Sequence, residues 1–153
     1  MTRIALVICG LVPLAFGIGP SAGGAIGCPP TRADALGPFY KAGAPVRAKV
    51  GKGGYVLTGQ VRAARTCRSL ARARIEFWLV NEQGEYDDAH RATVFSRRNG
   101  YYRFESNRPV GYEGRPPHIH VRVTARGFRT LVTQHYPRGS RKSATFNLVL
   151  TRR

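Results

Sequence analysis

Two histidines separated by one residue, His118 and His120, are the most chemically suggestive pair in this chain of 153 residues. The stretch 118–124 alternates polar and apolar residues, which is typical of a strand with one buried face. Side chains two residues apart on a strand point to the same side, so both imidazoles would face one site while Ile119 faces the core. The alternative interpretation is two unrelated polar residues. The chain has only four histidines, and half of them lie in this pair, which favours a metal site.

The residues before this pair add an oxygen ligand and a cation. Tyr112 and Arg115 lie in the stretch 111–117, where Pro116 and Pro117 restrict the backbone. The sequence offers no Cys, Asp or Glu group that makes a zinc-like set with the histidines. Imidazole nitrogens together with tyrosine oxygens suit ferric iron. The alternatives are a hairpin aromatic for Tyr112 and a surface charge for Arg115.

Short strands separated by turns must position these groups. Apolar residues do not recur at helical spacing over three turns, and the strand-like runs repeat every 8–15 residues, which predicts an all-β, single β-sandwich domain. Asn99-Gly100 predicts a hairpin between the runs before and after it. Trp78 faces away from the other apolar residues of its run and is expected to pack in a sheet layer. The predicted runs are 55–62, 75–80, 93–97, 101–106, 118–124, 128–133 and 144–150, preceded by an extended arm at 28–54.

Several of these runs together resemble the intradiol ring-cleavage dioxygenases, the family of the catechol 1,2- and protocatechuate 3,4-dioxygenases. Leu57–Val61 resembles the opening strand of that family, and Ile75–Tyr86 resembles its strand and turn ending in a first tyrosine ligand. Arg115-Pro116-Pro117-His118-Ile119-His120 is similar to the Arg-x-x-His-x-His ligand strand. Thr133-Gln134-His135-Tyr136 is similar to a Thr-Gln-x-Tyr segment that closes the pocket.

The resemblance implies a β-sandwich of the intradiol type, at 55–151, holding one non-haem Fe(III) per chain. Tyr86 and His118 would be equatorial ligands, and Tyr112 and His120 axial ones. Tyr112 would also accept a substrate proton, and Arg115 would stabilise charge on the substrate. Gln134 would be a supporting residue of the site. A turn tyrosine is the alternative interpretation of Tyr86.

The activity implied is cleavage of a catechol-type ring with O2 to a muconate-type dicarboxylic acid, so the partners are a small aromatic diol and O2. Only six residues separate Tyr112 from His118, which predicts an open site. His90 and His135 are interpreted as ordinary polar residues. The alternative for His135, which directly follows Gln134, is a residue that lines the site. The alternative functions are an inactive β-sandwich binding module of the cell envelope and a basic polyanion-binding protein.

The N-terminal residues 1–27 have the layout of a secretory signal peptide. A short basic start is followed by fifteen uncharged, mostly apolar residues at 4–18 and by small residues, which places cleavage near 22–27. We therefore expect export to the periplasm or the outside, with no stable membrane span after processing. Two alternatives remain open: an uncleaved anchor, and a lipoprotein-type cleavage box at 25–28 with a lipid on Cys28.

Cysteine usage agrees with export. Cys9 lies in the apolar run, which leaves Cys28 and Cys67 as an even pair, and we predict a disulfide between them. Two free thiols, or a lipidated Cys28, are the competing interpretations. The formal net charge is +17, and the arginines occur along the whole chain without a nucleic-acid-binding motif. No specific nucleic-acid partner is expected.

Overall fold

The computed structural model describes residues 27–153, so the predicted signal peptide lies outside the described residues except for Gly27. Within 27–153 the chain forms eight strands and no helix. The described part therefore contains no helix that is long and apolar enough to cross a membrane.

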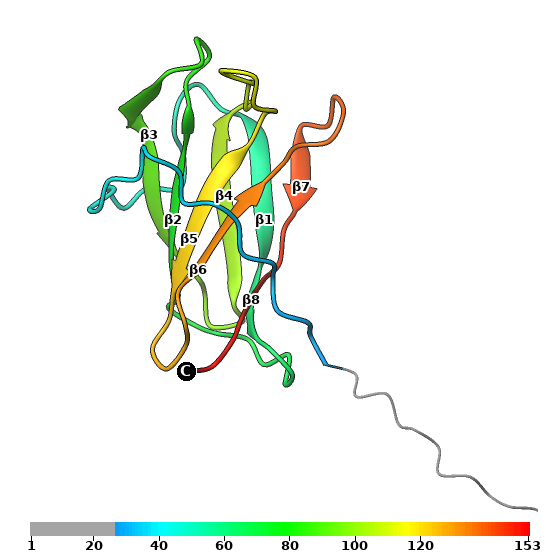
Figure 1. Cartoon of the computed structure of the whole chain (residues 1–153). Coiled ribbons are helices and arrows are strands. Elements are labelled where there is room, and N and C mark those ends of the chain that lie inside the picture. Colours follow the sequence, from blue (N-terminus) through cyan, green and yellow to red (C-terminus); the bar gives the residue numbers. More distant parts are fainter. Residues whose placement is uncertain (1–26) are drawn as a thin grey trace, which may run out of the picture.

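Two four-stranded sheets pack face to face as a β-sandwich (Figure 1), which confirms the predicted fold class. The sheet that carries the histidine pair has the order β3-β2-β5-β6 and is antiparallel throughout. In the other sheet β1 pairs with β4 antiparallel and with β7 and β8 parallel. The bounds are β1 Gly54–Ala63, β2 Arg74–Val80, β3 Tyr86–Phe95, β4 Tyr101–Asn107, β5 Ile119–Thr124, β6 Leu131–His135, β7 Ser143–Thr145 and β8 Leu148–Leu150.

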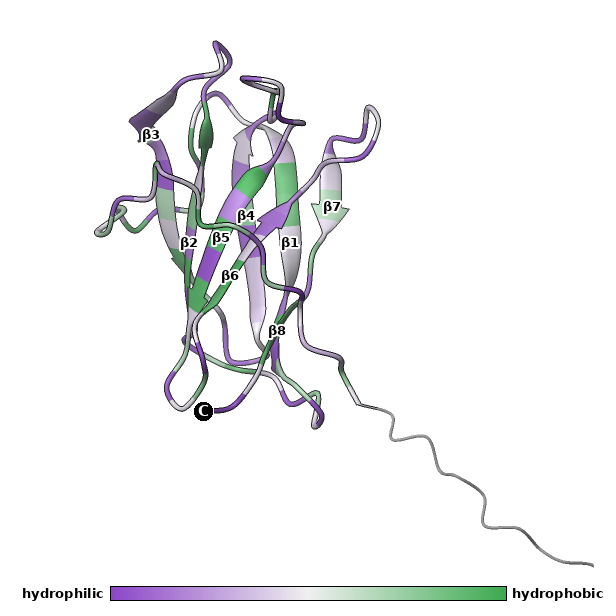
Figure 2. Cartoon of the chain, viewed as in Figure 1, coloured by the Kyte–Doolittle hydropathy of each residue, from purple (hydrophilic) through white to green (hydrophobic). Residues whose placement is uncertain are grey.

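The core lies between the sheets and follows the period of two that the sequence predicts. Ile119, Val121 and Val123 of β5 are fully buried, and hydrophobic and hydrophilic residues alternate along this strand (Figure 2). Phe77 of β2 stacks on Phe104 of β4, with ring centroids 4.2 Å apart, which joins the two sheets. Burial of each such side chain stabilises the fold by about 1.5–3 kcal/mol. This packing fixes which face of β5 turns outward, and so where the histidines point.

The Asn99-Gly100 turn forms, but the predicted hairpin is wrong. The Arg97 N–H donates to the Tyr101 carbonyl at 2.8 Å, closing the turn. The strands on either side of it nevertheless belong to different sheets, because β3 pairs with β2 and β4 pairs with β1. The reason is the contact that follows the turn: the Gly100 carbonyl accepts a hydrogen bond from the Val61 N–H at 2.9 Å, which directs the chain onto β1.

The last two predicted runs also differ from the structure. The run 144–150 is broken into β7 and β8, because the Asn147 side chain accepts a hydrogen bond from the Gln60 N–H at 3.0 Å and interrupts the ladder. The run 128–133 is shifted, and β6 begins only at Leu131. Phe128 instead forms an isolated bridge with Arg152.

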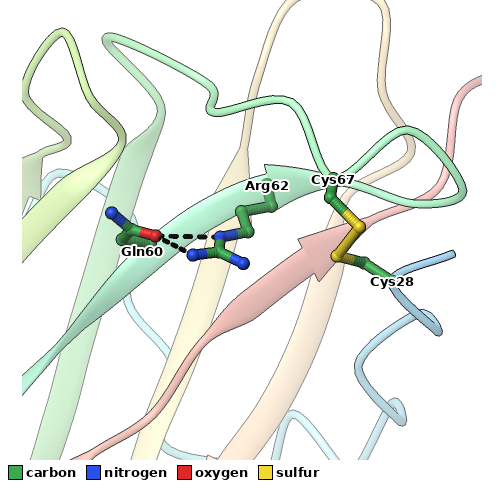
Figure 3. Close-up of a disulfide and its surroundings, with 4 residues drawn as sticks. All are labelled: Cys28, Gln60, Arg62 and Cys67. Atoms are coloured by element: carbon green, nitrogen blue, oxygen red, sulfur yellow. Dashed lines mark hydrogen bonds between the residues drawn. A yellow bond between two sulfur atoms is a disulfide. The ribbon is translucent and has the colours of Figure 1, made fainter. Parts of the chain in front are cut away.

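Residues 27–53 form an extended arm without a strand, attached to the sandwich by isolated bridges such as Val46 with Thr93. The arm crosses the outer face of the β3-β2-β5-β6 sheet (Figure 1). Its beginning is tied to the β1–β2 loop by a disulfide between Cys28 and Cys67 (Figure 3), the pair that the sequence predicted. A Cys28 sulfur in this bond is not available for lipid attachment.

Candidate metal centre

Sheet register places the residues of the centre in a row. Trp78 of β2 lies opposite His120 of β5, and His120 lies opposite Gln134 of β6. Directly opposite residues share one face of a sheet, and this face is the outer one because the odd-numbered residues of β5 fill the core. The outward direction of His120 is therefore fixed by the packing of Ile119 and Val121 beneath it.

The four predicted ligands converge on this face. The Oη atoms of Tyr86 and Tyr112 lie 3.0 Å apart, and the Oη of Tyr86 lies 3.0 Å from Nε2 of His120. Nε2 of His118 lies 3.1 Å from Nε2 of His120. Tyr86 comes from the start of β3 and Tyr112 from the β4–β5 connection, so three separate segments bring these atoms together.

Both imidazoles are held in the neutral form, and His118 presents a free lone pair toward the cluster. Nδ1 of His118 lies 2.7 Å from the Pro116 carbonyl, which can only accept, so Nδ1 carries the hydrogen and Nε2 is unprotonated. Burial, together with the nearby His118 and Arg115, lowers the pKa of His120 to about 3. Burial also lowers the pKa of His118. Neutral imidazole is the form that binds metal ions.

The phenol of Tyr86 needs a nearby cation to ionise. Burial raises the pKa of Tyr86, and its hydrogen bond with Tyr112 and the charge of that neighbour raise it further. A bound high-valent cation would reverse this balance and hold both phenols as phenolates. The two phenols and two imidazoles therefore fit a site that binds an ion such as Fe(III) better than a site that binds no metal.

The spacing of the donor atoms also fits a shared ion. Ligand atoms about 2.0–2.1 Å from one first-row metal, at roughly right angles, lie about 3 Å from one another. The three separations in the cluster are 3.0, 3.0 and 3.1 Å. Within residues 27–153, no group of three or more His, Cys, Asp or Glu residues is placed to hold a metal. A metal at this face therefore depends on the two tyrosines.

A tight turn places the predicted cation beside the cluster. Tyr112 and Arg115 face each other across Glu113 and Gly114, whose φ angles of 46° and 76° give the turn a left-handed course. Nη2 of Arg115 donates to Oε1 of Gln134 at 2.8 Å. Arg115 therefore lies at the edge of the cluster, held by Gln134, and contributes no ligand atom.

The arm completes the centre. Phe39 stacks on Tyr86 with ring centroids 4.4 Å apart, and Nε2 of Gln134 donates to the Ala35 carbonyl at 2.7 Å. Gly37, with φ of 75°, passes so close that a Cβ there would lie 3.0 Å from Cε1 of His120. The segment 34–40 is thus a wall of the site.

No family model matches the chain. Chlorocatechol 1,2-dioxygenase of Rhodococcus opacus is 31% identical over a match that covers 67% of this chain and 54% of that protein. Catechol 1,2-dioxygenase 2 of Acinetobacter lwoffii is 34% identical over a match that covers 64% of this chain and 48% of that protein. The chain spans about half the length of the curated relatives it matches.

Solved structures agree with these relatives. The dioxygenase domain of a dioxygenase–carbohydrate-binding protein fusion from Streptomyces sp. SirexAA-E superposes with a TM-score of 0.73 at 26% identity, over 82% of this chain and 100% of that one. The chain belongs to the intradiol ring-cleavage dioxygenase family. An intradiol ring-cleavage dioxygenase from Tetranychus urticae, at 18% identity and a TM-score of 0.74 over 81% of this chain and 95% of that one, shares the fold.

Two contributions to the site in this family member were missed by sequence reasoning. Trp78 was expected only to pack in a sheet layer, but it stacks on His120 with centroids 4.8 Å apart and planes 6° from parallel. The segment Gly37-Pro38-Phe39-Tyr40 was assigned to the arm without a role in the site. The glycine and the two aromatic residues of this segment could have indicated a close contact with another part of the protein. The sequence does not show which strand the segment crosses.

The other two histidines lie apart from the cluster. His135 points to the opposite face of β6, where its Nε2 lies 2.7 Å from Oη of Tyr55. His90 contacts the Asp87 carboxylate at 2.7 Å. Both are consistent with their interpretation as ordinary polar residues.

The main cavities lie beside the cluster. Cavities of about 430 and 490 Å³ share Gln134 and Tyr136 with the site, and neither is lined by the four predicted ligands.

Proposed function

We propose that the protein is a non-haem Fe(III)-dependent dioxygenase that opens a catechol-type ring between its two hydroxyl-bearing carbons. Both atoms of O2 would enter the product, a muconate-type dicarboxylic acid. The observation that carries this proposal is the row of donor atoms from Tyr112 through Tyr86 and His120 to His118, in which neighbouring atoms lie 3.0–3.1 Å apart. Relatives named chlorocatechol, catechol and hydroxyquinol 1,2-dioxygenase support the reaction class.

The residues of the site have two kinds of role: some bind the metal ion, and others accept a proton or stabilise charge on the substrate. When bound, ferric iron supplies a Lewis-acidic centre that keeps the phenols ionised and makes a catechol reactive toward O2. His118 and His120 bind through nitrogens that burial keeps unprotonated. Tyr86 stacks under Phe39 and contacts His120 as well as Tyr112, and it acts as a permanent ligand.

Tyr112 and Arg115 would handle protons and charge. Tyr112 lies on the exposed β4–β5 connection, so its Oη can leave the cluster and take the proton of a substrate hydroxyl. Arg115 is held by Gln134 at the same edge, where its guanidinium can stabilise negative charge that appears on the substrate ring. Gln134 is a positioning residue, because its amide links Arg115 to the Ala35 carbonyl of the arm.

Two variants test the proposal through different readouts. His120→Ala removes a ligand and should lose both iron and ring cleavage. Arg115→Ala should keep the iron and the colour that arises from charge transfer between phenolate and iron. It should slow turnover by about 100–1,000-fold, the usual effect of removing one charge-stabilising donor. The measurements are iron content and O2 uptake with catechol. Full ring-cleaving activity in both variants would show that the site lies elsewhere.

We further propose that the protein is exported. The apolar run 4–18 supports this, and so does the pairing of Cys28 with Cys67, since structural disulfides persist in oxidising compartments. N-terminal sequencing of the protein from the producing cells should give a start between residues 22 and 28. An intact start in the cytoplasmic fraction would contradict export.

A further inference from the structure

The charged side chains at one end of the sandwich are all positive. The strand register brings four segments to this end: the β1–β2 loop 64–73, the β3–β4 turn 96–100, the β5–β6 loop 125–130 and the residues 151–153 after β8. Each contains at least two arginines, and every charged side chain in the four segments is an arginine. All of these arginines are exposed. We call these four segments the basic end.

The charge of the basic end is not neutralised within the protein. The ion pairs found in residues 27–153 involve none of its arginines. Residues 1–26 contain no Asp or Glu, so they add no acidic partner. Seven of the eight acidic residues lie between Glu76 and Glu113, outside the four segments. The four segments therefore combine nine arginines with no acidic side chain, and an external anionic surface would complement this end.

The metal cluster lies toward the opposite end of the outer sheet face. Strand β5 begins at the ligands His118 and His120 and ends at Thr124, where the basic end starts. The turn that holds Tyr112 and Arg115 lies at the far end with the start of β3. A surface bound to the basic end would therefore leave the site uncovered.

The chain enters the fold at the basic end. Cys28 is bonded to Cys67 of the β1–β2 loop, and its carbonyl accepts a hydrogen bond from the Arg65 N–H at 3.2 Å. Figure 1 shows the described chain beginning and ending near this end. The apolar run 4–18 precedes Cys28 by ten residues, a reach of at most about 35 Å. A bilayer that holds this run would therefore lie within that reach of Cys28, which is at the basic end.

We propose that the basic end is a docking surface for an anionic phospholipid bilayer, with the metal site facing away from the membrane. Guanidinium groups match phosphate headgroups in geometry and charge. The arginines sit on separate loops, and residues 27–153 have no helix to enter a nucleic-acid groove, which favours an extended anionic plane. This surface belongs to the folded body, so it acts whether or not the N-terminal run is removed.

The test compares two variants of equal charge in the full chain. The basic-end variant is Arg68→Gln, Arg98→Gln, Arg126→Gln and Arg129→Gln. The matched control is Lys52→Gln, Arg138→Gln, Arg141→Gln and Lys142→Gln. All eight side chains are exposed and form no side-chain hydrogen bond or ion pair within residues 27–153. Equal melting temperatures establish that both variants fold, and Arg98→Glu alone serves as a smaller second perturbation.

Binding is measured by flotation with phosphatidylcholine vesicles, with and without one quarter phosphatidylglycerol. Each basic residue beside an anionic bilayer contributes about fivefold in affinity. We expect the basic-end variant, in which four such residues are neutralised, to lose about 600-fold of the phosphatidylglycerol-dependent binding and the control to lose less than about fivefold. Binding of the unmodified chain should vanish in 1 M salt, where the screening length is about 3 Å.

Three outcomes would overturn the proposal. Equal losses in the two variants would mean that only net charge matters. Equal binding to both kinds of vesicle would assign the affinity to the apolar run. Displacement of the protein from vesicles by double-stranded DNA or heparin at equal charge concentration would make the basic end a general polyanion surface.

Discussion

Gly37→Ala tests whether the arm sets the position of His120. Gly37 has φ of 75°, and an alanine in this region costs about 1–2 kcal/mol. Its Cβ would also lie 3.0 Å from Cε1 of His120, whereas carbon atoms prefer about 3.5–4.0 Å. The arm or the ring must therefore move by about 0.5 Å. Trp78 already stacks on His120, which restricts the directions in which the ring can move.

Gly43→Ala is the matched control. Gly43 has φ of 78°, and no atom lies within 4 Å of a Cβ placed there, so it carries the same backbone cost without the contact. Both variants should lose about 1–2 kcal/mol of unfolding free energy, measured by urea denaturation of the iron-free protein. Gly37→Ala alone should bind iron about 10-fold more weakly in chelator competition. This is the lower limit of the loss in metal affinity that follows from changing a residue in contact with a metal ligand. Equal iron affinity in the two variants would refute the proposed control of His120 by the arm.

Three further predictions concern other parts of the molecule. Tyr112→Phe should retain part of the iron through three ligands, with a shifted colour and impaired ring cleavage, and unchanged turnover would contradict its role as proton acceptor. Cys67→Ser should lower the unfolding free energy by about 3–4 kcal/mol by opening the loop to Cys28, and an unchanged urea midpoint would contradict this. Burial lowers the pKa of His135 to about 4, below about 6.5 for an unfolded histidine, so the unfolded chain binds more protons in that window and stability falls as pH falls from about 6.5 to 4. His135→Gln should flatten this part of the urea-derived stability profile, and an unchanged slope would assign the effect to other groups.

The parts of the fold that were predictable follow from local periodicity. The alternation of 118–124 identified a strand, the face that is buried and the shared direction of His118 and His120. That information lies within seven residues, because a strand repeats every two residues. The same alternation identified Ile75, Phe77 and Leu79 as core residues of β2.

Features that depend on distant contacts were not predictable in this way. Asn99-Gly100 gave the turn, but the hydrogen bond from Val61 decides that the next strand joins the other sheet. Tyr86 begins a strand and Tyr112 precedes a turn, so neither belongs to a periodic pattern. Only the family resemblance suggested that they meet. The contact of Gly37 with His120 joins residues more than eighty positions apart, and no local rule indicates it.

The visible spectrum and iron content of the purified protein test the central claim most directly. Two phenolate ligands beside two imidazoles should give about one ferric ion per chain and a coloured protein, through charge transfer from phenolate to iron. The colour should disappear in His120→Ala and persist in Arg115→Ala. A colourless protein that carries zinc, or no metal after growth with iron, would contradict the assignment of Tyr86, Tyr112, His118 and His120 as the ligands of an Fe(III) centre.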